Sequence, residues 1–347
     1  MPLFCCNIYA CLLLRTLTAK RLLYELPIKS ALPLQAFPLY LRDMEKIIII
    51  AGPTGVGKSD FAEALAHHIN GEIVNADQGQ LYEPLTIGTA KPDWKTHKIP
   101  HHLFDHVTEP RNCSNSEYQK AVKECVNDIH ARGKRAILVG GSGFYYQMLL
   151  FDFAQFPQKT APDRQSIPEF DGSAWEHLQS IDPDRARALH PHDLYRIQRA
   201  LEIFYTYNVL PSALQLMYKP WAPYHLVHIT RDTQELYARI NRRTHLMLEQ
   251  GWLEETASLT PAWKEFARVK KTIGYDDILA YQFNLLSYPQ LIETIQQKTR
   301  NYAKRQKTYF RSLLKKIPSC QLDNVQEINL TLSPVDLYLN QLIQRLS

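Results

Sequence analysis

Cysteine is scarce in this sequence, and the few cysteines form no recognisable framework. The chain has 347 residues and six cysteines, at positions 5, 6, 11, 113, 125 and 320. They contain no CxxC pair and no Cys/His run with zinc-finger spacing. A disulfide scaffold and a structural zinc are therefore not expected, and a reducing compartment is the default.

The chain also lacks a long apolar run and a strong excess of either charge. The first apolar stretch ends at Arg15, which is too short to span a bilayer, and no basic residue precedes it as a secretory signal requires. The 40 basic and 35 acidic residues leave a net charge of +5, which permits a polyanionic partner without demanding one. The hydrophobic content of 45% excludes bulk disorder and collagen. We expect a cytoplasmic monomer without membrane association or zinc.

Residues 1–43 differ from the rest of the chain. They contain no glycine and three of the six cysteines, and no helix or strand period runs through them. Met44 is followed at once by a strand-like run over residues 46–51. We expect an unstructured extension, or a segment upstream of a true start at Met44, and a targeting peptide is the alternative.

A candidate phosphate-binding loop follows that first strand-like run. It is a full GxxxxGK[ST] match, formed by Gly52, Pro53, Thr54, Gly55, Val56, Gly57, Lys58 and Ser59. The glycines let backbone N–H groups surround phosphate oxygens, Lys58 supplies a point charge, and the Ser59 hydroxyl is placed to ligate Mg²⁺. An apolar strand precedes the loop and an amphipathic helix follows it, which favours phosphate binding over an ordinary glycine-rich turn.

Further apolar runs predict the class of the fold. Residues 72–77, 134–140 and 225–230 read as buried strands, and helical patterns such as 117–131 separate them. This alternation predicts an α/β fold with a mainly parallel sheet flanked by helices. In such sheets the ligand lies outside the carboxyl ends of the strands. We therefore expect three segments to converge there: the loop at 52–59, the segment from Asp77, and the segment 140–143 (GGSG).

Asp77, at the end of the second apolar run, has several possible roles. It could lie near Mg²⁺ as in an ATPase or a small-molecule kinase, accept a proton from a nucleophile, or cap a helix. Spacing alone does not separate these roles. A GTPase is excluded, because the nearest match to its Asn-Lys-x-Asp motif is 90–93, where Ala90 replaces the asparagine.

A series of sequence blocks after the loop resembles the tRNA dimethylallyltransferase (tRNA isopentenyltransferase) family, bacterial type. The blocks keep family order over roughly residues 46–311, and together they are far more specific than any one of them. They are DQGQLY (77–82), IGTAKP (87–92), HHLFD (101–105), GGSGFY (140–145), RIQRALE (196–202), residues of RINRRTHLMLEQGW (239–252), IGY (273–275) and TRNYAKRQ (299–306).

The resemblance implies an activity. Such enzymes transfer a dimethylallyl group from dimethylallyl diphosphate to N6 of the adenosine 3′-adjacent to the anticodon (position 37), with Mg²⁺, and release diphosphate. By resemblance the 52–59 loop would hold the diphosphate, Asp77 would hydrogen-bond or deprotonate the adenine amine, and Ser142 and Arg243 would complete the catalytic set. The residues implied to contact the tRNA anticodon stem-loop are Asp77, Gln78, Gly79, Gln80, Ser142, Arg164, Arg196, Arg199, Lys271, Gly274, Tyr275, Lys304, Arg305, Lys307 and Arg311. Gln78 departs from the family, which usually has serine there.

The resemblance also implies a domain plan. Residues 44–155 and 223–320 would form a P-loop NTPase-like core, and 156–222 would form an inserted, small all-helical domain that contacts tRNA. Residues 321–347 are expected to be a C-terminal tail with a short helix.

The segment 299–316 supports a polyanionic partner independently of the resemblance. It carries seven basic and no acidic residues. On a helix, five of the basic residues fall on one stripe, opposite a mainly apolar stripe that includes Gln306; they are Arg300, Lys304, Lys307, Arg311 and Lys315. Such a helix could pack on the core and present cations to a phosphate backbone, and a solvated basic face without a partner is the alternative.

We therefore expect a tRNA prenyltransferase. A P-loop small-molecule kinase that uses ATP is the main alternative, and a non-catalytic RNA-binding protein with an idle loop is the third. Intact Lys58, Ser59 and Asp77 argue against the third possibility, and the basic helix argues against the second.

Overall fold

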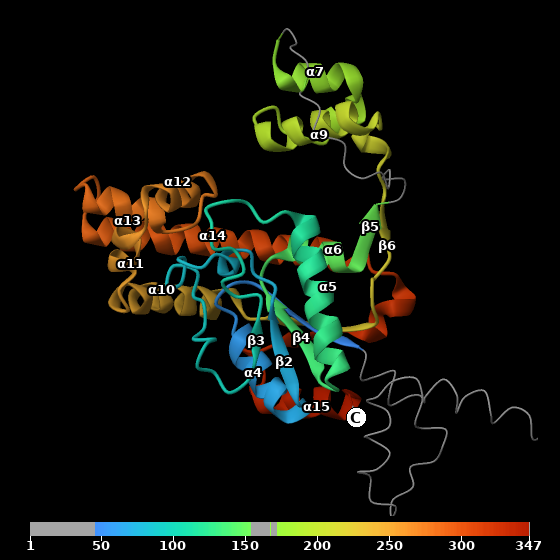
Figure 1. Ribbon diagram of the computed structural model, residues 1–347, viewed down its shortest axis with the longest axis vertical. Coiled ribbons are helices and arrows are strands. Elements are labelled where there is room, and N and C mark those ends of the chain that lie inside the picture. Colours follow the sequence, from blue (N-terminus) through green and yellow to red (C-terminus); the bar gives the residue numbers. More distant parts are fainter. Residues whose placement is uncertain (1–45, 154–166, 168–171, 347) are drawn as a thin grey trace, which may run out of the picture. The chain divides into compact units, whose positions relative to one another are not determined.

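Six parallel strands form the central sheet of the computed structural model, which describes residues 46–153, 167 and 172–346 (Figure 1). The strand order is β3-β2-β4-β1-β7-β8, and every neighbouring pair is parallel. The strands are β1 (Ile47–Ala51), β2 (Gly71–Asn75), β3 (His101–His102), β4 (Arg135–Gly140), β7 (Tyr224–Thr230) and β8 (Val325–Asn329). The predicted parallel α/β sheet is confirmed. Within the described residues, no helix is both long and apolar enough to cross a membrane.

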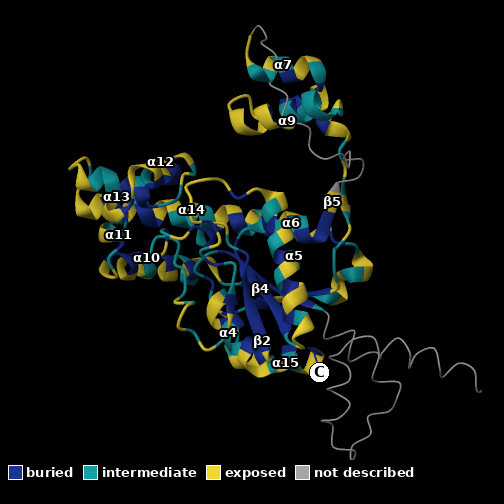
Figure 2. Ribbon diagram, viewed as in Figure 1, coloured by how far each residue is buried: buried dark blue, intermediate teal, exposed yellow. Residues whose placement is uncertain are grey.

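Strand β1 lies in the middle of the sheet because its sequence can be buried on both faces. It pairs with β4 on one side and β7 on the other, and all five of its residues are buried. Ile48 and Ile50 point to one face of the sheet, and the alternation of a strand directs Ile47 and Ile49 to the other. Figure 2 shows the sheet as a dark blue layer between helices whose outer faces are yellow.

Helices cover both faces of this sheet. Helix α4 (Lys58–Ile69) packs on β1, β2 and β4, and α15 (Val335–Leu346) packs on α4. Helix α5 (Asn115–Ala131) packs on β2 and β4, and a capping box at Ser114 and Glu117 fixes its start. The predicted helices at the loop and at 117–131 therefore form as expected.

A helical layer extends from the carboxyl side of the sheet. It consists of α10 (Thr233–Glu249), α11 (Trp252–Ser258), α12 (Pro261–Val269), α13 (Tyr275–Gln282) and α14 (Tyr288–Leu314). Helices α10 and α14 run side by side, and α13 packs on α14 (Figure 1). Helix α14 begins well before the basic segment that predicted it, because Ser287 and Gln290 form a capping box at its start.

A second compact unit comprises residues 147–221. After α6 (Gly143–Leu150), its elements are β5 (Phe151–Phe153), α7 (Ala174–Ile181), α8 (Pro183–Arg187), α9 (Leu194–Tyr207) and β6 (Leu216–Tyr218). Leu178, Ile197 and Leu201 lie in its own small apolar core.

This unit differs from the predicted all-helical insertion at 156–222. It begins at residue 147, before the predicted start. It also contains an antiparallel strand pair, in which residues 151–153 pair with residues 216–218. The predicted extension at 1–43 and the predicted tRNA contact Arg164 lie outside the described residues.

A buried carboxylate ties the start of β2 to neighbouring segments. The Glu72 side chain is 1% exposed, forms ion pairs with Arg132 and Lys134 (3.0 Å), and is hydrogen-bonded to His102 Nε2 (2.7 Å). Burial acts to raise the pKa of this carboxyl, but the hydrogen bonds from Arg132, Lys134 and His102 outweigh it and lower the pKa to about 2. The stabilisation is therefore complete above the ordinary glutamate pKa and is lost as the pH falls toward 2.

We expect Glu72→Ala to lower the free energy of unfolding by about 3 to 5 kcal/mol at neutral pH, because Arg132 and Lys134 lose a buried carboxylate partner and His102 loses its hydrogen-bond acceptor. Chemical denaturation of the variant and the wild type measures this difference. Glu83→Ala, at an exposed glutamate, is the control and should change stability by less than about 0.5 kcal/mol. Equal losses in both variants would show that Glu72 has no special role.

Candidate functional site

The phosphate-binding loop leaves the carboxyl end of β1 and leads directly into α4. Gly52 lies so close to β7 that a Cβ at this position would stand 2.4 Å from the carbonyl oxygen of Ile229. Inside the loop, Lys58 Nζ donates to the carbonyl of Pro53 at 2.8 Å. Burial lowers the pKa of Lys58 to about 8, with Asp77 acting to raise it and Arg243 to lower it. A bound anion would offset that burial.

Three arginines brace the outside of the loop. Arg231 Nε donates to the carbonyl of Val56, and Arg239 Nε donates to the carbonyl of Gly55, both at 2.9 Å. Arg243 donates to the Thr54 hydroxyl. Because Arg239 and Arg243 lie four residues apart on α10, they share one face of that helix. The carbonyls of Gly55 and Val56 are thus held outward by arginine side chains.

Gln306, on α14, joins the loop to the segment after β4. Its Oε1 accepts from the Thr54 amide and its Nε2 donates to the Gly141 carbonyl, both at 2.8 Å. The residue is 5% exposed. Two of the three segments predicted to converge are therefore fixed to each other by one side-chain amide.

The third segment is a turn that begins at Asp77. The buried Asn75 holds its backbone, because Asn75 Oδ1 accepts from the Asp77 amide at 2.8 Å and Asn75 Nδ2 donates to the Asp77 carbonyl at 3.1 Å. Asp77 Oδ1 accepts from the Gly79 amide at 3.1 Å. The hydroxyl of Ser142 accepts from the Gln78 amide at 3.0 Å. The three predicted segments therefore meet at the carboxyl edge of the sheet.

Two cavities open around this meeting point. One, of about 380 Å³, is lined among others by Thr54, Asp77, Trp252, Tyr302 and Arg305. The other, of about 340 Å³, is lined by residues of the loop and the start of α4, from Gly55 to Asp60, and by arginines of α10. Arg243 lines both cavities, so a molecule with an anionic end and an apolar end could occupy them together.

A smaller hollow of about 70 Å³ lies where Lys58, Ser59, Asp77 and Arg243 come together. The oxygens of Ser59 and Asp77 are donors of the kind that Mg²⁺ prefers. Among the residues with described positions, no group of three or more His, Cys, Asp or Glu side chains could hold a metal. This donor set fits Mg²⁺, which usually keeps several waters and binds through substrate phosphates.

Some of the predicted tRNA-contacting residues line the 380 Å³ cavity, and others lie near it without lining it. Gln78, Gly79 and Lys271 line the 380 Å³ cavity. Tyr275 is only 1% exposed and its hydroxyl donates to Glu255 at 2.7 Å, so its side chain is engaged within the protein. Gln80 donates to the carbonyls of Thr89 and Ala90. Gly274 is the N-cap residue that precedes α13, with a φ of 94°.

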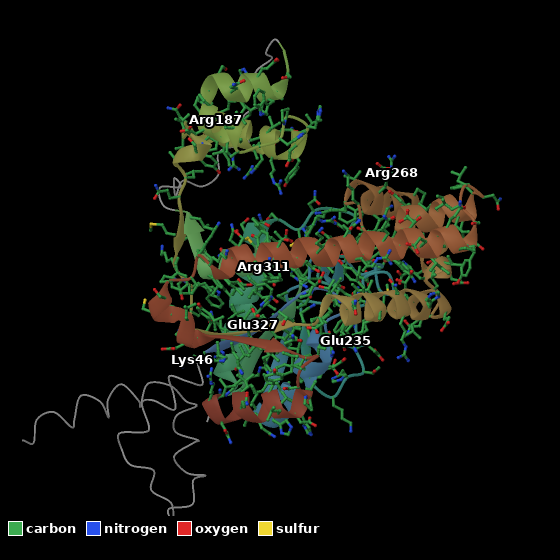
Figure 3. All side chains as sticks on the ribbon, turned by 180° about the vertical axis from the view of Figure 1, so that it is seen from behind. Lys46, Arg187, Glu235, Arg268, Arg311 and Glu327 are labelled. Carbon is green, nitrogen blue, oxygen red and sulfur yellow. The ribbon has the colours of Figure 1, made fainter. Side chains whose placement is uncertain are left out.

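The predicted basic stripe on α14 is only partly available to a ligand. Arg300 is engaged by Glu293 and Asn241, and Lys307 donates to the Thr233 hydroxyl at 3.1 Å. Lys304, Arg311 and Lys315 are exposed. Arg305 lies off this stripe and lines the 380 Å³ cavity. Figure 3 shows Arg311 on α14 and Glu327 on β8, which line a further cavity on that side.

In the second unit, the predicted pair on α9 is exposed but already engaged. Arg196 pairs with Asp193 at 2.6 Å and Arg199 pairs with Glu202 at 2.8 Å. Both are surface pairs between residues three apart in sequence, which contribute little to stability.

Sequence reasoning assigned no role to several residues that build the site. Gln306 was identifiable as the one amide in an otherwise mainly apolar stripe of α14. Arg239 lies one helical turn before the predicted Arg243, and this spacing was the sequence signal that could have identified Arg239 as a residue of the site. Glu255, which accepts hydrogen bonds from the backbone of residues 86–88, had no sequence signal at all.

Comparisons with known proteins agree on one family. The model of the IPP transferase family matches residues 80–313. The tRNA dimethylallyltransferase of Anoxybacillus flavithermus is 38% identical over 77% of this chain and 88% of its own length. A tRNA isopentenylpyrophosphate transferase structure from Bacillus halodurans aligns with a TM-score of 0.57 and 27% identity, over 87% of this chain and 97% of its own. A eukaryotic dimethylallyltransferase acting on tRNA aligns with a TM-score of 0.67 and 29% identity, over 82% and 74%.

We expect the affinity of the loop for inorganic pyrophosphate to fall as the pH rises above about 8, by up to about tenfold per pH unit, because Lys58 then loses its charge. Titration calorimetry between about pH 7 and pH 9 measures this dependence. The Lys58→Met variant should bind pyrophosphate more weakly at pH 7 and should lack the part of the pH dependence that comes from Lys58. Any pH dependence that remains in the variant comes from other groups, including pyrophosphate itself, and can be subtracted. Parallel curves for the two proteins would contradict the assignment.

Proposed function

The chain belongs to the IPP transferase family, and we propose that it transfers a dimethylallyl group from dimethylallyl diphosphate to N6 of the adenosine 3′-adjacent to the anticodon in tRNA. The relatives are named for group transfer to tRNA, which sets aside the kinase alternative. The observation that carries the proposal is that Arg243 and Asp77 share one cavity with the phosphate-binding loop.

That juxtaposition suits both halves of the transfer. When the C–O bond of the allylic diphosphate breaks, negative charge grows on the leaving group, where loop amides, Lys58 and Arg243 can stabilise it. The new bond forms between the allylic carbon and N6, and the amine then releases a proton. Asp77, fixed by Asn75 and Gly79, is the carboxylate in position to orient the amine and accept that proton.

The 380 Å³ cavity supports a role in holding both reactants. Trp252, Met247 and Ile240 give it apolar walls that suit a dimethylallyl group. Burial raises the pKa of the Tyr302 phenol, with the Asp77 charge adding to the effect, so the hydroxyl keeps its proton and can donate within the cavity.

Mg²⁺ is the cofactor that we propose for this site. Ser59 and the substrate diphosphate would hold it, with Asp77 close by, and its charge would further stabilise the leaving diphosphate.

We propose that tRNA is bound by cations around the same edge of the sheet. Arg305 and Lys271 line the cavity itself, and Lys304 and Arg311 continue along the exposed side of α14. Gln78 and Gly79 at the cavity belong to the same proposed set of contacts. Arg196 and Arg199, which lie in the second unit, are proposed as tRNA contacts of that unit by itself. Backbone phosphates would supply the affinity, and the cavity would select the adenosine.

The transfer assay tests this function directly. We expect the protein with Mg²⁺ to attach the labelled allylic group of dimethylallyl diphosphate to unmodified tRNA with adenosine after the anticodon, and to leave tRNA with guanosine there unlabelled. Phosphorylation of a small metabolite from ATP, without prenyl transfer, would overturn the proposal.

We expect Asp77→Asn to lower the rate of transfer by about 10² to 10⁴-fold, because the amine loses its proton acceptor, while tRNA affinity stays within about threefold of the wild type. Single-turnover kinetics and a filter-binding assay measure the two quantities. Asp93→Asn, at an exposed aspartate outside the cavities, is the matched control and should transfer normally. A large loss of tRNA binding in Asp77→Asn would make Asp77 structural instead.

Neutralising Lys304 and Arg311 together should weaken tRNA binding and reduce the slope of log affinity against log salt by about one for each phosphate that is no longer neutralised. Binding of K304Q/R311Q measured over a range of salt concentrations tests this expectation. Lys120→Gln, at an exposed lysine on α5, controls for the loss of surface charge. An unchanged slope would remove this side of α14 from the interface.

A further inference from the structure

A half-buried glutamate outside the sheet collects four hydrogen bonds. Glu255, on α11, accepts at Oε2 from the amides of Thr86 (3.1 Å) and Ile87, and at Oε1 from the amide of Gly88 (3.1 Å). Its Oε1 also accepts from the Tyr275 hydroxyl at 2.7 Å. Hydrogen bonds to a carboxylate are stronger than those between neutral groups, so this arrangement fixes three consecutive residues of one loop.

The loop held in this way lies against two aromatic side chains. A Cβ at Gly88 would stand 2.3 Å from Trp252 Nε1 and 2.5 Å from the Tyr275 hydroxyl. Only glycine allows the backbone to approach so closely. Residues 86–88 are therefore fastened to α11 and α13 both by hydrogen bonds and by contact.

The other end of the same loop reaches the Asp77 turn. Gln80 Nε2 donates to the carbonyls of Thr89 (3.1 Å) and Ala90 (3.0 Å). A Cβ at Gly79 would stand 3.2 Å from the Thr89 methyl carbon, and the Gly79 amide donates to Asp77 Oδ1. The chain of contacts thus runs from Glu255 through residues 86–90 to the carboxylate of Asp77, and Gly88, Thr89 and Ala90 also line the 380 Å³ cavity.

We propose that Glu255 is a positioning residue for the transfer, which sets the orientation of Asp77 through the loop 86–90. The proposal rests on the function proposed above. Glu255 touches no reactant, because it is not among the residues that line the described cavities. Its effect should therefore appear in the rate of the step that needs Asp77 and not in the binding of the diphosphate.

Glu255→Gln is the first variant to measure, because it keeps the shape of the side chain but turns an NH₂ group toward backbone donors. We expect kcat to fall by about 10- to 100-fold, as misplacement of a catalytic group by a fraction of an ångström allows. The KM for dimethylallyl diphosphate should stay within about twofold, since the loop 52–59 is held by other residues. Glu254→Gln, at the exposed neighbour with the same charge change, should behave as the wild type.

A double-mutant cycle separates positioning from a general loss of folded enzyme. In an Asp77→Glu background, where the carboxylate is already displaced, adding Glu255→Gln should cost less than about threefold in kcat. A merely structural role would cost the same factor in both backgrounds. Full additivity of the two losses would therefore overturn the proposal.

Amide hydrogen exchange gives a readout that does not depend on activity. The amides of residues 86–88 should exchange slowly in the wild type and at least about tenfold faster in Glu255→Gln. Tyr275→Phe removes only the hydroxyl donor, so it should speed exchange less and lower kcat less, and it serves as the second variant if Glu255→Gln fails to fold. Unchanged exchange in the variants would overturn the proposal. Failure of the wild type to transfer the prenyl group would refute the proposed function instead, and exchange would then decide alone whether Glu255 holds the loop.

Discussion

The amide of Gln306 is the constraint on which the site depends most. It donates and accepts between two backbone segments that are far apart in the chain, the loop after β1 and the turn after β4. A buried amide that satisfies one donor and one acceptor at once fixes both position and direction, because rotation of the group would place donor against donor. Helix α14 is thereby tied to the sheet edge, and its neighbour α10 brings Arg239 and Arg243 to the loop with it.

Around that constraint the site gathers opposite charges in little space. Lys58, Asp77 and Arg243 meet at one small hollow, and burial lowers the pKa of both cations. Burial of unlike charges is favourable only when each has partners, and here the Thr54 hydroxyl and the Pro53 carbonyl supply some of them. An arriving diphosphate would meet donors that are already oriented, so little reorganisation is needed at the moment of reaction.

The parallel sheet, the phosphate-binding loop and the convergence of three segments could be predicted from the sequence. Each of them depends on a run of neighbouring residues. The limits of the second unit were missed, since the pairing of β5 with β6 joins residues that are distant in sequence. The hydrogen bonds of Glu255 to Tyr275 and to residues 86–88 were not predicted for the same reason: they depend on how α11 and α13 pack beside those residues. The basic stripe on α14 was visible as a pattern, yet only the structure separates cations engaged within the protein, such as Arg300, from exposed ones.

The brevity of β3 has a consequence for the behaviour of the protein in concentrated solution. This strand closes one side of the sheet with only two residues, so few unpaired backbone groups remain there to capture a strand from another molecule. Long, regular outer strands invite such pairing and lead to aggregation, and short ones discourage it. The short outer strand β3 therefore lowers the tendency of this isoleucine-rich sheet to pair with a strand of another molecule at that edge.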